Sequence, residues 1–403
     1  MNCIDLMSSL DSSAAYLSSR LTFLLALAVG VIAANLYYAQ PLTTLMARTL
    51  GLSASASGLV VTLTQIGYGL GVLCLVPLGD LRENRQVILV LIAVASFALV
   101  GIGTSQTLTP YLLSAFFLGV GASAVQLIVP FAAHLSLASK RGQVVGKLMS
   151  GLMLGIMLSR PIASLVADLF SWNAVFYISA LLTSAVGILL AFALPKRHPA
   201  NPDLHYFSLL RSMSTLFFQH TVLRRRALYQ GCMFAAFCLF WTATPMVLAS
   251  DFHLTQTQIA VFALVGVSGA VFAPLAGRAA DRGHTQRATT GAFVVGGLSF
   301  LLTFLMPVGS TLSLAFFTVA AILLDAGVSA NLVLGQRAIF TLPAELRGRL
   351  NSLYIATIFI GGSFGSFVGA WAFAHGGWVW AARIGLAMPF SGLLYFATEK
   401  KSV

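Results

Sequence analysis

Two ionisable side chains stand inside long apolar runs of this sequence. Asp325 lies in the run 321–327, and Arg160 lies in the run 151–163. A carboxyl group in a low-dielectric cavity ionises less readily, because ionisation loses hydration, and it can then exchange protons near neutral pH. A charged arginine at such a depth needs a partner or a wet cavity. We therefore expect proton coupling or substrate binding at Asp325 and Arg160. The alternative is a structural pair, or a structural aspartate capped by Asn331.

The elements that must position these side chains are membrane-spanning helices. Hydrophobic residues make up 58% of the chain and charged residues only 8%, whereas a soluble domain carries roughly a quarter charged residues. Apolar runs of about 20 residues recur, each long enough to cross a bilayer. A lipid-exposed backbone must satisfy its own polar groups, so these runs are helices and the fold is an all-α membrane protein. We expect twelve transmembrane helices near residues 21–46, 56–79, 87–104, 110–136, 144–168, 173–194, 226–250, 257–279, 288–307, 311–340, 350–374 and 379–396.

The net charge of +12 is distributed as in a membrane protein. Lys and Arg gather in alternate loops, among them Arg82, Lys140, Arg141 and the run 224–226. This is the positive-inside distribution, so we interpret the charge as topology and not as nucleic-acid binding. Both termini and the central segment are then cytoplasmic. The first 19 residues carry no Lys or Arg, which is unlike the start of a signal peptide.

The chain is built from two matching halves. Asp80 closes an apolar stretch that follows residues 52–53, and Asp281 closes a similar stretch after residues 254–255. Secondary transporters use duplicated membrane halves to build a site that opens to either side. We expect six-helix bundles at 21–194 and 226–396, with cytoplasmic segments at 1–20, 195–225 and 397–403. Within the central segment, residues 207–218 could form a helix on the membrane surface.

The segment 76–85, Val-Pro-Leu-Gly-Asp-Leu-Arg-Glu-Asn-Arg, resembles a signature of the major facilitator superfamily. That signature follows helix 2 and has the general form G-x-L-A-D-R-x-G-R-R. A second copy, after helix 8, fits at Gly277, Asp281 and Arg282. The resemblance covers nearly the whole chain and is strongest to twelve-span drug–proton antiporters and related bacterial exporters. It implies two pseudo-symmetric six-helix bundles, the major facilitator fold, in a bacterial inner membrane.

In that family the signature is held to stabilise the outward-facing state. The resemblance therefore implies a conformational latch at Asp80 and Arg85 in the first half, and at Asp281 and Arg282 in the second. A carboxylate at a helix end can accept bonds from a neighbouring helix N-terminus or from an arginine. The alternative is that these four residues are ordinary topology charges on tight loops.

Helix 5 resembles the glycine-rich helix 5 motif of antiporters. Small residues recur every four positions, which lets another backbone pack closely or slide along one face. Arg160-Pro161 stands where the family motif has Gly-Pro. The motif implies export. The residues that we assign to this packing face are Gly151, Gly155, Ser159, Pro161 and Ala163.

Helices 1, 4, 7 and 10 line the central cavity in the family. The resemblance therefore makes Asn35, Gln126, Trp241 and Asn331 candidates for substrate contact, although mid-membrane amides often only bridge helices. The arginine that many antiporters carry four residues before a glycine in helix 4 is absent, because Ala115 precedes Gly119 at that offset. Either Arg160 substitutes for it or the coupling differs.

These observations predict a secondary active transporter that works by alternating access. Its expected activity is proton-coupled efflux of a small amphipathic molecule or drug, and the alternative is uptake of a sugar, amino acid or organic acid. A membrane receptor or membrane-embedded enzyme is a remote alternative. The sequence has no phosphate-binding loop, Ser/His/Asp set or metal-spaced His/Cys cluster. We therefore expect no enzymatic activity, no metal and no cofactor, with the proton gradient as energy source and a monomer in the lipid bilayer.

Overall fold

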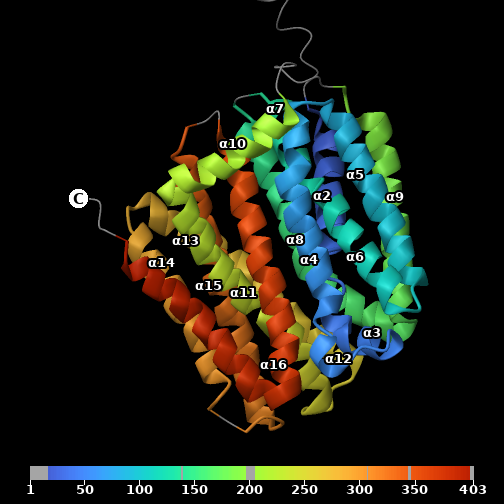
Figure 1. Ribbon diagram of the computed structural model, residues 1–403, viewed down its shortest axis with the longest axis vertical. Coiled ribbons are helices and arrows are strands. Elements are labelled where there is room, and N and C mark those ends of the chain that lie inside the picture. Colours follow the sequence, from blue (N-terminus) through green and yellow to red (C-terminus); the bar gives the residue numbers. More distant parts are fainter. Residues whose placement is uncertain (1–16, 138, 197–204, 306, 344–345, 400–403) are drawn as a thin grey trace, which may run out of the picture.

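The computed structural model describes residues 17–137, 139–196, 205–305, 307–343 and 346–399. The first sixteen residues, residues 197–204 near the start of the central segment and the last four residues lie outside the described residues. They include most of both expected tails. Within the described residues, all regular elements are helices. Helices α2–α9 form an N-terminal half and helices α11–α16 form a C-terminal half, which stand side by side in Figure 1.

The N-terminal half contains six passes made from α-helices and short 3-10 turns. Several passes are composite, because a 3-10 turn or a break divides them. In chain order the elements are α2 (Ser19–Ala34), η1 (Gln40–Leu42), α3 (Thr43–Thr49), η2 (Ala54–Ala56), α4 (Leu59–Cys74), η3 (Val76–Asp80), α5 (Asn84–Thr104), α6 (Leu108–Ala122), α7 (Val125–His134), α8 (Arg141–Leu169) and α9 (Trp172–Ala193).

The C-terminal half repeats this order after a connecting helix, α10. Its elements are α10 (Tyr206–Gln219), α11 (Thr221–Ser250), α12 (Gln256–Ala263), η4 (Leu264–Ser268), α13 (Gly269–Asp281), α14 (Thr285–Leu302), α15 (Thr311–Phe340) and α16 (Arg347–Ala397). Helix α11 begins five residues earlier than the sequence suggested. Its first turns carry arginines that bind other parts of the half: Arg226 donates to Thr289, and Arg225 donates to Thr398.

Eight of the described helices are long and apolar enough to span a membrane on their own. One of them, α16, holds two passes, because the backbone leaves helical geometry at Gly376 and Gly377. Gly377 has φ +60°, a conformation that only glycine adopts readily. The shorter α2, α12 with α13, and α14 make the remaining passes. The expected architecture of twelve transmembrane helices in two six-helix bundles is therefore confirmed.

Glycines hold the same pair of helices together in each half. In the N-terminal half, a Cβ on Gly155 would lie 2.1 Å from the carbonyl oxygen of Gly30, so α8 packs directly on the backbone of α2. In the C-terminal half, a Cβ on Gly365 would lie 2.0 Å from the carbonyl oxygen of Ala235, so α16 packs directly on α11. Small residues permit this close approach of membrane helices. The two halves thus share the packing of their first and fifth helices.

The connecting helix α10 lies across one end of the molecule and contacts both halves (Figure 1). The hydroxyl of Tyr206 donates to the carbonyl of Cys74 in the N-terminal half at 2.8 Å, and Arg349 of α16 donates to Ser212 at 3.3 Å. Its own Leu209, Met213 and Leu216 form its buried face. We call this end, with the loops that follow Asp80 and Asp281, the basic end, and the opposite one the far end.

Topology can be tested by labelling cysteines introduced at exposed loop positions. We expect Arg82→Cys and Gln286→Cys, both at the basic end, to react with an impermeant maleimide only from the cytoplasmic side, because cationic loops stay on that side. His253→Cys at the far end should react only from outside. All three positions are exposed. Reaction of the first two from opposite sides would contradict the duplicated architecture.

Candidate transport site

Two broken helices meet between the halves and build the centre of the molecule. In the first pass, α2 gives way to a 3-10 turn at Gln40 and Pro41, and in the eighth pass η4 separates α12 from α13. Broken helices within a membrane are tolerated where neighbouring protein re-satisfies their backbone, and in transporters they often form the binding site. The side chains around these two breaks form the candidate site.

Arg160 of α8 is the charged centre of the site and is only 2% exposed. Its Nε donates to the side-chain oxygen of Gln40 at 2.8 Å. Three aromatic rings surround the guanidinium carbon: Trp241 at 4.5 Å, Phe237 at 5.1 Å and Tyr37 at 5.2 Å from the ring centroids. Such contacts stabilise a cation more strongly when water is excluded. This arginine is therefore held by rings and one amide.

Asp325 of α15 lies on the other side of the interface between the halves and is 4% exposed. Its Oδ1 accepts a hydrogen bond from the indole nitrogen of Trp241 at 3.0 Å. Arg160 and Asp325, both within the described part of the chain, do not approach to 4.0 Å and so form no direct salt bridge. Trp241 instead touches both, since its ring packs on one and its N–H binds the other. The alternative of a direct structural pair between Asp325 and Arg160 is therefore not what the structure has, because an indole bridges the two side chains.

Gly266 of η4 lies beside the space between the two charged side chains. A Cβ on this glycine would lie 3.2 Å from Asp325 Oδ2 and 3.5 Å from one terminal nitrogen, Nη1, of Arg160. It would also lie 3.2 Å from the Trp241 ring. The carboxylate and the guanidinium therefore border the same small volume, which the absence of a side chain on Gly266 leaves open.

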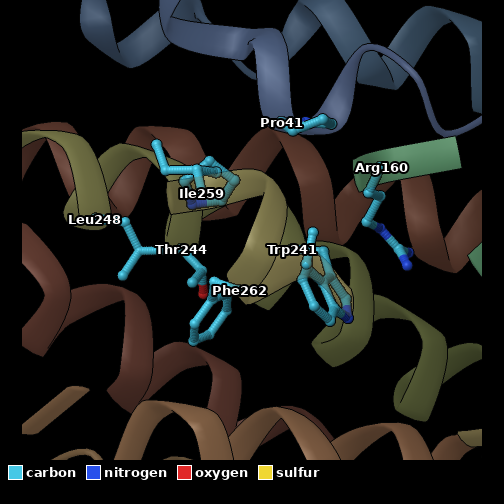
Figure 2. Close-up of a pocket in the computed structure, with 9 residues that line it drawn as sticks. Pro41, Arg160, Trp241, Thr244, Leu248, Ile259 and Phe262 are labelled. Carbon is cyan, nitrogen blue, oxygen red and sulfur yellow. The ribbon is translucent and has the colours of Figure 1, made fainter. Parts of the chain in front are cut away.

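A small cavity adjoins Arg160 on the far-end side of the interface (Figure 2). Its volume of about 10 Å³ has room for about one water molecule. Figure 2 shows the side chains of Arg160 and Trp241 next to each other, below Pro41 of the broken first pass. Apart from Arg160, the lining is mostly apolar, with Leu248, Ile259 and Phe262. Both halves contribute to it, so any movement of one half against the other changes its size.

The other predicted cavity residues lie in separate polar clusters. Asn35 binds Thr183 and Ser179, both within the N-terminal half. Asn331 donates to Gln230 at 2.8 Å within the C-terminal half. Both amides bridge helices in this state. Of the four predicted contact residues, only Trp241 lies with Arg160 and Asp325.

Gln126 connects the two halves nearer the basic end. It donates to the Tyr68 hydroxyl at 3.0 Å, and its oxygen accepts from Asn351 of α16 at 3.3 Å. The ring of Tyr68 also packs on Phe359, with centroids 4.3 Å apart. This cluster lies on the side of the interface through which a substrate would pass toward the basic end.

The predicted latch residues lie at the basic end, and the structure gives two of them partners in other helices. Asp281 forms a salt bridge with Arg337 of α15, and not with the neighbouring Arg282. Arg85 donates to the carbonyl of Ala191 at the end of α9. Asp80 ends η3. Arg337 was missed from the sequence because it lies far along the chain, in the last turn of another helix.

The small-residue face of α8 packs on α2, and Arg160 follows this face along the same helix. Gly151 packs on the carbonyl of Ala26, as Gly155 packs on Gly30. Ser159 bonds back to the carbonyl of Ile156, and Ala163 is fully buried. Pro161 lies inside the helix. The face thus fixes α8 against the first pass, which carries Gln40, the partner of Arg160.

The far end is closed by contacts between α12 and the N-terminal half. The side-chain nitrogen of Gln256 donates to the carbonyl of Pro41 at 3.0 Å and to Ser164 at 3.3 Å. The hydroxyl of Thr257 donates to Asp168 near the end of α8. These bonds cross the interface directly outside the cavity. They separate the cavity from the far-end surface in this state.

Cross-linking can test whether this seal must open during transport. We expect the double variant Asp168→Cys with Thr257→Cys to lose transport on oxidation and to recover it on reduction, because a disulfide would hold the far end shut. The measurement is flux before and after copper phenanthroline and then dithiothreitol, with each single variant as control. Full transport by the cross-linked protein would show that the seal plays no part in the cycle.

The sequence pointed to Arg160, Asp325 and Trp241, and it did not single out three other contributors to the site. Gln40 precedes a proline inside an apolar run, a signal for a broken helix that could have singled it out. Phe237 gave no signal, because aromatic residues are common throughout the chain. Gly266 also gave none, since its importance depends on two side chains from other helices.

Comparison with known proteins agrees with this architecture. The family model described as Major Facilitator Superfamily matches residues 22–247 and 226–402. The chain belongs to the major facilitator superfamily. It is 37% identical over 380 residues to the uncharacterized transporter YgaY of Escherichia coli O157:H7, covering 94% of this chain and 95% of that one. It is 31% identical over 359 residues to a probable transporter of Streptomyces coelicolor, covering 88% and 82%.

Solved structures of this superfamily share the fold. The crystal structure of the nucleoside transporter NupG superposes with a TM-score of 0.75 at 13% identity, covering 93% of this chain and 100% of that one. The crystal structure of the human organic anion transporter MFSD10 superposes with a TM-score of 0.65 at 14% identity, covering 93% and 98%. This major facilitator protein is therefore a multi-pass membrane transporter.

Proposed function

We propose that this transporter couples the movement of small amphipathic organic molecules to protons, with Asp325 carrying the proton. The observation that carries the proposal is the arrangement of Asp325 and Arg160. They come from opposite halves, are almost fully buried, and border one small volume without a direct salt bridge. A titratable group that also faces the partner half can link its protonation to the relative position of the halves.

The coupling works through the charge on Asp325. When it is ionised, its attraction to Arg160 across a low-dielectric interface draws the two halves together at this level. When it is protonated, that attraction falls away and the halves can separate. Trp241 remains bound to Asp325 in either state, because each form of the carboxyl group keeps an oxygen that can accept the indole N–H. The indole therefore holds the carboxyl group in place while its charge changes.

Two directions of transport remain under this mechanism. Export is favoured by the resemblance of α8 to the helix 5 motif of antiporters, which provides the packing face of Gly151 and Gly155. Uptake of an organic acid is the second candidate, and the observation that favours it is the buried guanidinium of Arg160 on the cavity wall. In either case we propose a monomer in a bacterial inner membrane, with both termini in the cytoplasm.

The test is flux in proteoliposomes under an imposed pH gradient. The probes are a cationic dye, a biocide, a sugar, an amino acid and a small organic acid. We expect at least one probe to move only when protons flow, and its direction relative to the protons separates export from uptake. If every transported probe moved equally fast with and without the gradient, the proposed coupling would be wrong.

A further inference from the structure

We infer that Arg160 is a subsite for the carboxylate of an organic monoanion, and that this anion binds together with a proton on Asp325. The inference rests on the proposed proton coupling and deepens it, because it names a substrate class and fixes the sign of the coupling. It makes the protein a cotransporter of anion and proton.

The first argument is the unused hydrogen-bonding capacity of Arg160. A guanidinium has five N–H donors, and the bond from Nε to Gln40 uses one of them. The terminal nitrogen Nη2 is buried and finds no hydrogen-bond partner among the described residues. The side-chain nitrogen of Gln40 is also buried and also has no hydrogen-bond partner among the described residues. Because a buried donor without a partner is costly, two adjacent ones mark a place where an acceptor group belongs.

The second argument is the chemistry of the surroundings, which favours a carboxylate on an apolar body. The rings of Tyr37, Phe237 and Trp241 lie 4.5–5.2 Å from the guanidinium carbon. The planar fork of a guanidinium matches the two oxygens of a carboxylate. The adjoining cavity wall is apolar, with Leu248, Ile259 and Phe262. An aromatic or aliphatic organic acid satisfies both the charged and the apolar parts of this lining.

The third argument is charge balance, which fixes the sign of the coupling. The titratable groups around Arg160 are Asp325, Tyr37 and Cys238, and among a carboxyl, a phenol and a thiol only the carboxyl group ionises readily near neutral pH. With Asp325 ionised, an incoming anion would place two negative charges beside one arginine. With Asp325 protonated, the anion alone balances Arg160. Anion binding and proton binding therefore favour each other, as linkage requires.

This coupling distinguishes substrate classes. A cation would compete with the proton for the charge on Asp325, which is the arrangement for exchange. A neutral molecule would leave that charge balance unchanged. Only an anion recruits the proton, so an inward proton gradient would draw the anion inward.

The cavity in this state is too small for such a ligand, and the construction of the interface explains how space arises. The lining is divided between Pro41 and Arg160 on one half and the α11 and α12 residues on the other. Separation of the halves at this level would enlarge the space between them. Gly266 keeps the volume between Arg160 and Asp325 free of a side chain. We therefore expect Gly266→Ala to weaken anion binding, because its Cβ would enter that volume.

The experiment measures ligand binding and proton uptake together in the purified full-length protein. Benzoate, phenylacetate and hexanoate are added to protein in a weakly buffered solution with a pH indicator, and binding is followed by calorimetry. We expect uptake of about one proton for each bound carboxylate, and an affinity that improves about tenfold for each unit fall in pH while Asp325 remains ionised in the free protein. Benzyl alcohol, which has the same ring but no charge, should show neither effect.

Three variants separate ligand binding from proton binding. Asp325→Asn should bind the carboxylates with an affinity independent of pH and without proton uptake, because the amide imitates the protonated acid. Arg160→Gln should lose carboxylate binding, and a thermal melt establishes that it is folded. If this variant does not fold, Gly266→Ala supplies the comparison through its weaker binding. Wild-type protein that bound none of the three carboxylates, or bound them without proton uptake, would overturn the inference.

The flux assay keeps this failure distinct from failure of the proposed function. Proton-driven movement of a cationic or neutral probe, with no carboxylate binding, would remove the anion subsite and leave the proton coupling of Asp325 in place. Absence of proton dependence for every transported probe would remove the coupling itself.

Discussion

Asp325→Asn should abolish proton-driven transport and leave the protein folded. The amide cannot exchange a proton near neutral pH, so the charge at the interface between the halves no longer changes. It still accepts the hydrogen bond that Trp241 donates at 3.0 Å in the wild type, which keeps the local structure. In proteoliposomes with an imposed pH gradient, we expect accumulation to fall to the background of empty vesicles.

Exchange at equilibrium is the informative companion measurement. The variant should still exchange labelled for unlabelled substrate when no gradient is present, because that process needs movement of the halves but no net proton transfer. Asp251→Asn, at an exposed acidic residue in a far-end loop, is the matched control and should accumulate substrate as the wild type does. Gradient-driven accumulation by Asp325→Asn at the wild-type rate would remove Asp325 from the mechanism.

Gly155→Ala should destabilise the N-terminal half by about 1–3 kcal/mol, the usual cost of overpacking a tight contact. The new Cβ would lie 2.1 Å from the carbonyl oxygen of Gly30, and backbone cannot move aside as a flexible side chain can. The two helices must separate, which also displaces Arg160 from Gln40. The measurement is the thermal unfolding midpoint in detergent, together with flux.

The same helix offers a control. Gly146 lies in α8 as well, but nothing stands within 4 Å of the position of its Cβ. Gly146→Ala should therefore be neutral or stabilising by up to about 1 kcal/mol, since alanine is the better helix former. The pseudo-equivalent pair in the other half is Gly365→Ala, which we expect to destabilise, and Gly348→Ala, which we expect to be tolerated. Equal unfolding midpoints for Gly155→Ala and Gly146→Ala would contradict the close packing of α8 on α2.

Much of the fold could be predicted because hydrophobic length and the repeated Asp80 and Asp281 stretches are local properties of the sequence. The break at Gln40 is signalled by the proline that follows it. The break around Gly266 was less visible, because a helix can be interrupted by tertiary contacts that no short segment reveals. The connecting helix α10 was expected from the sequence at residues 207–218. Its bounds are 206–219.

The candidate site was predictable in its charged members and in Trp241, but not in the contacts among them. Arg160 and Asp325 attract attention because charges are rare at such depth. That Trp241 bridges them, and that Gln40 binds Arg160, depends on how four passes from two halves meet. The same reason explains the Asp281 pair: the sequence suggested its neighbour Arg282, whereas the structure supplies Arg337 from α15.

The proposed direction of coupling depends on the charge of the substrate. The antiporter resemblance of α8 favours export, whereas the vacant hydrogen-bonding capacity of Arg160 favours an anion that travels with its proton. Both use the mechanism that we propose, in which the charge on Asp325 controls how closely the halves approach. They differ only in the charge of the substrate that borders Gly266.

The most direct test of this mechanism is the response of both ends of the molecule to pH. Spin labels at Ser53 and His253 would report the far end, and labels at Lys140 and Gln286 would report the basic end. Lowering the pH should shift the two distance distributions in opposite directions, and Asp325→Asn should remove the shift. Distributions that stay the same at every pH, or an unchanged response in Asp325→Asn, would contradict the account.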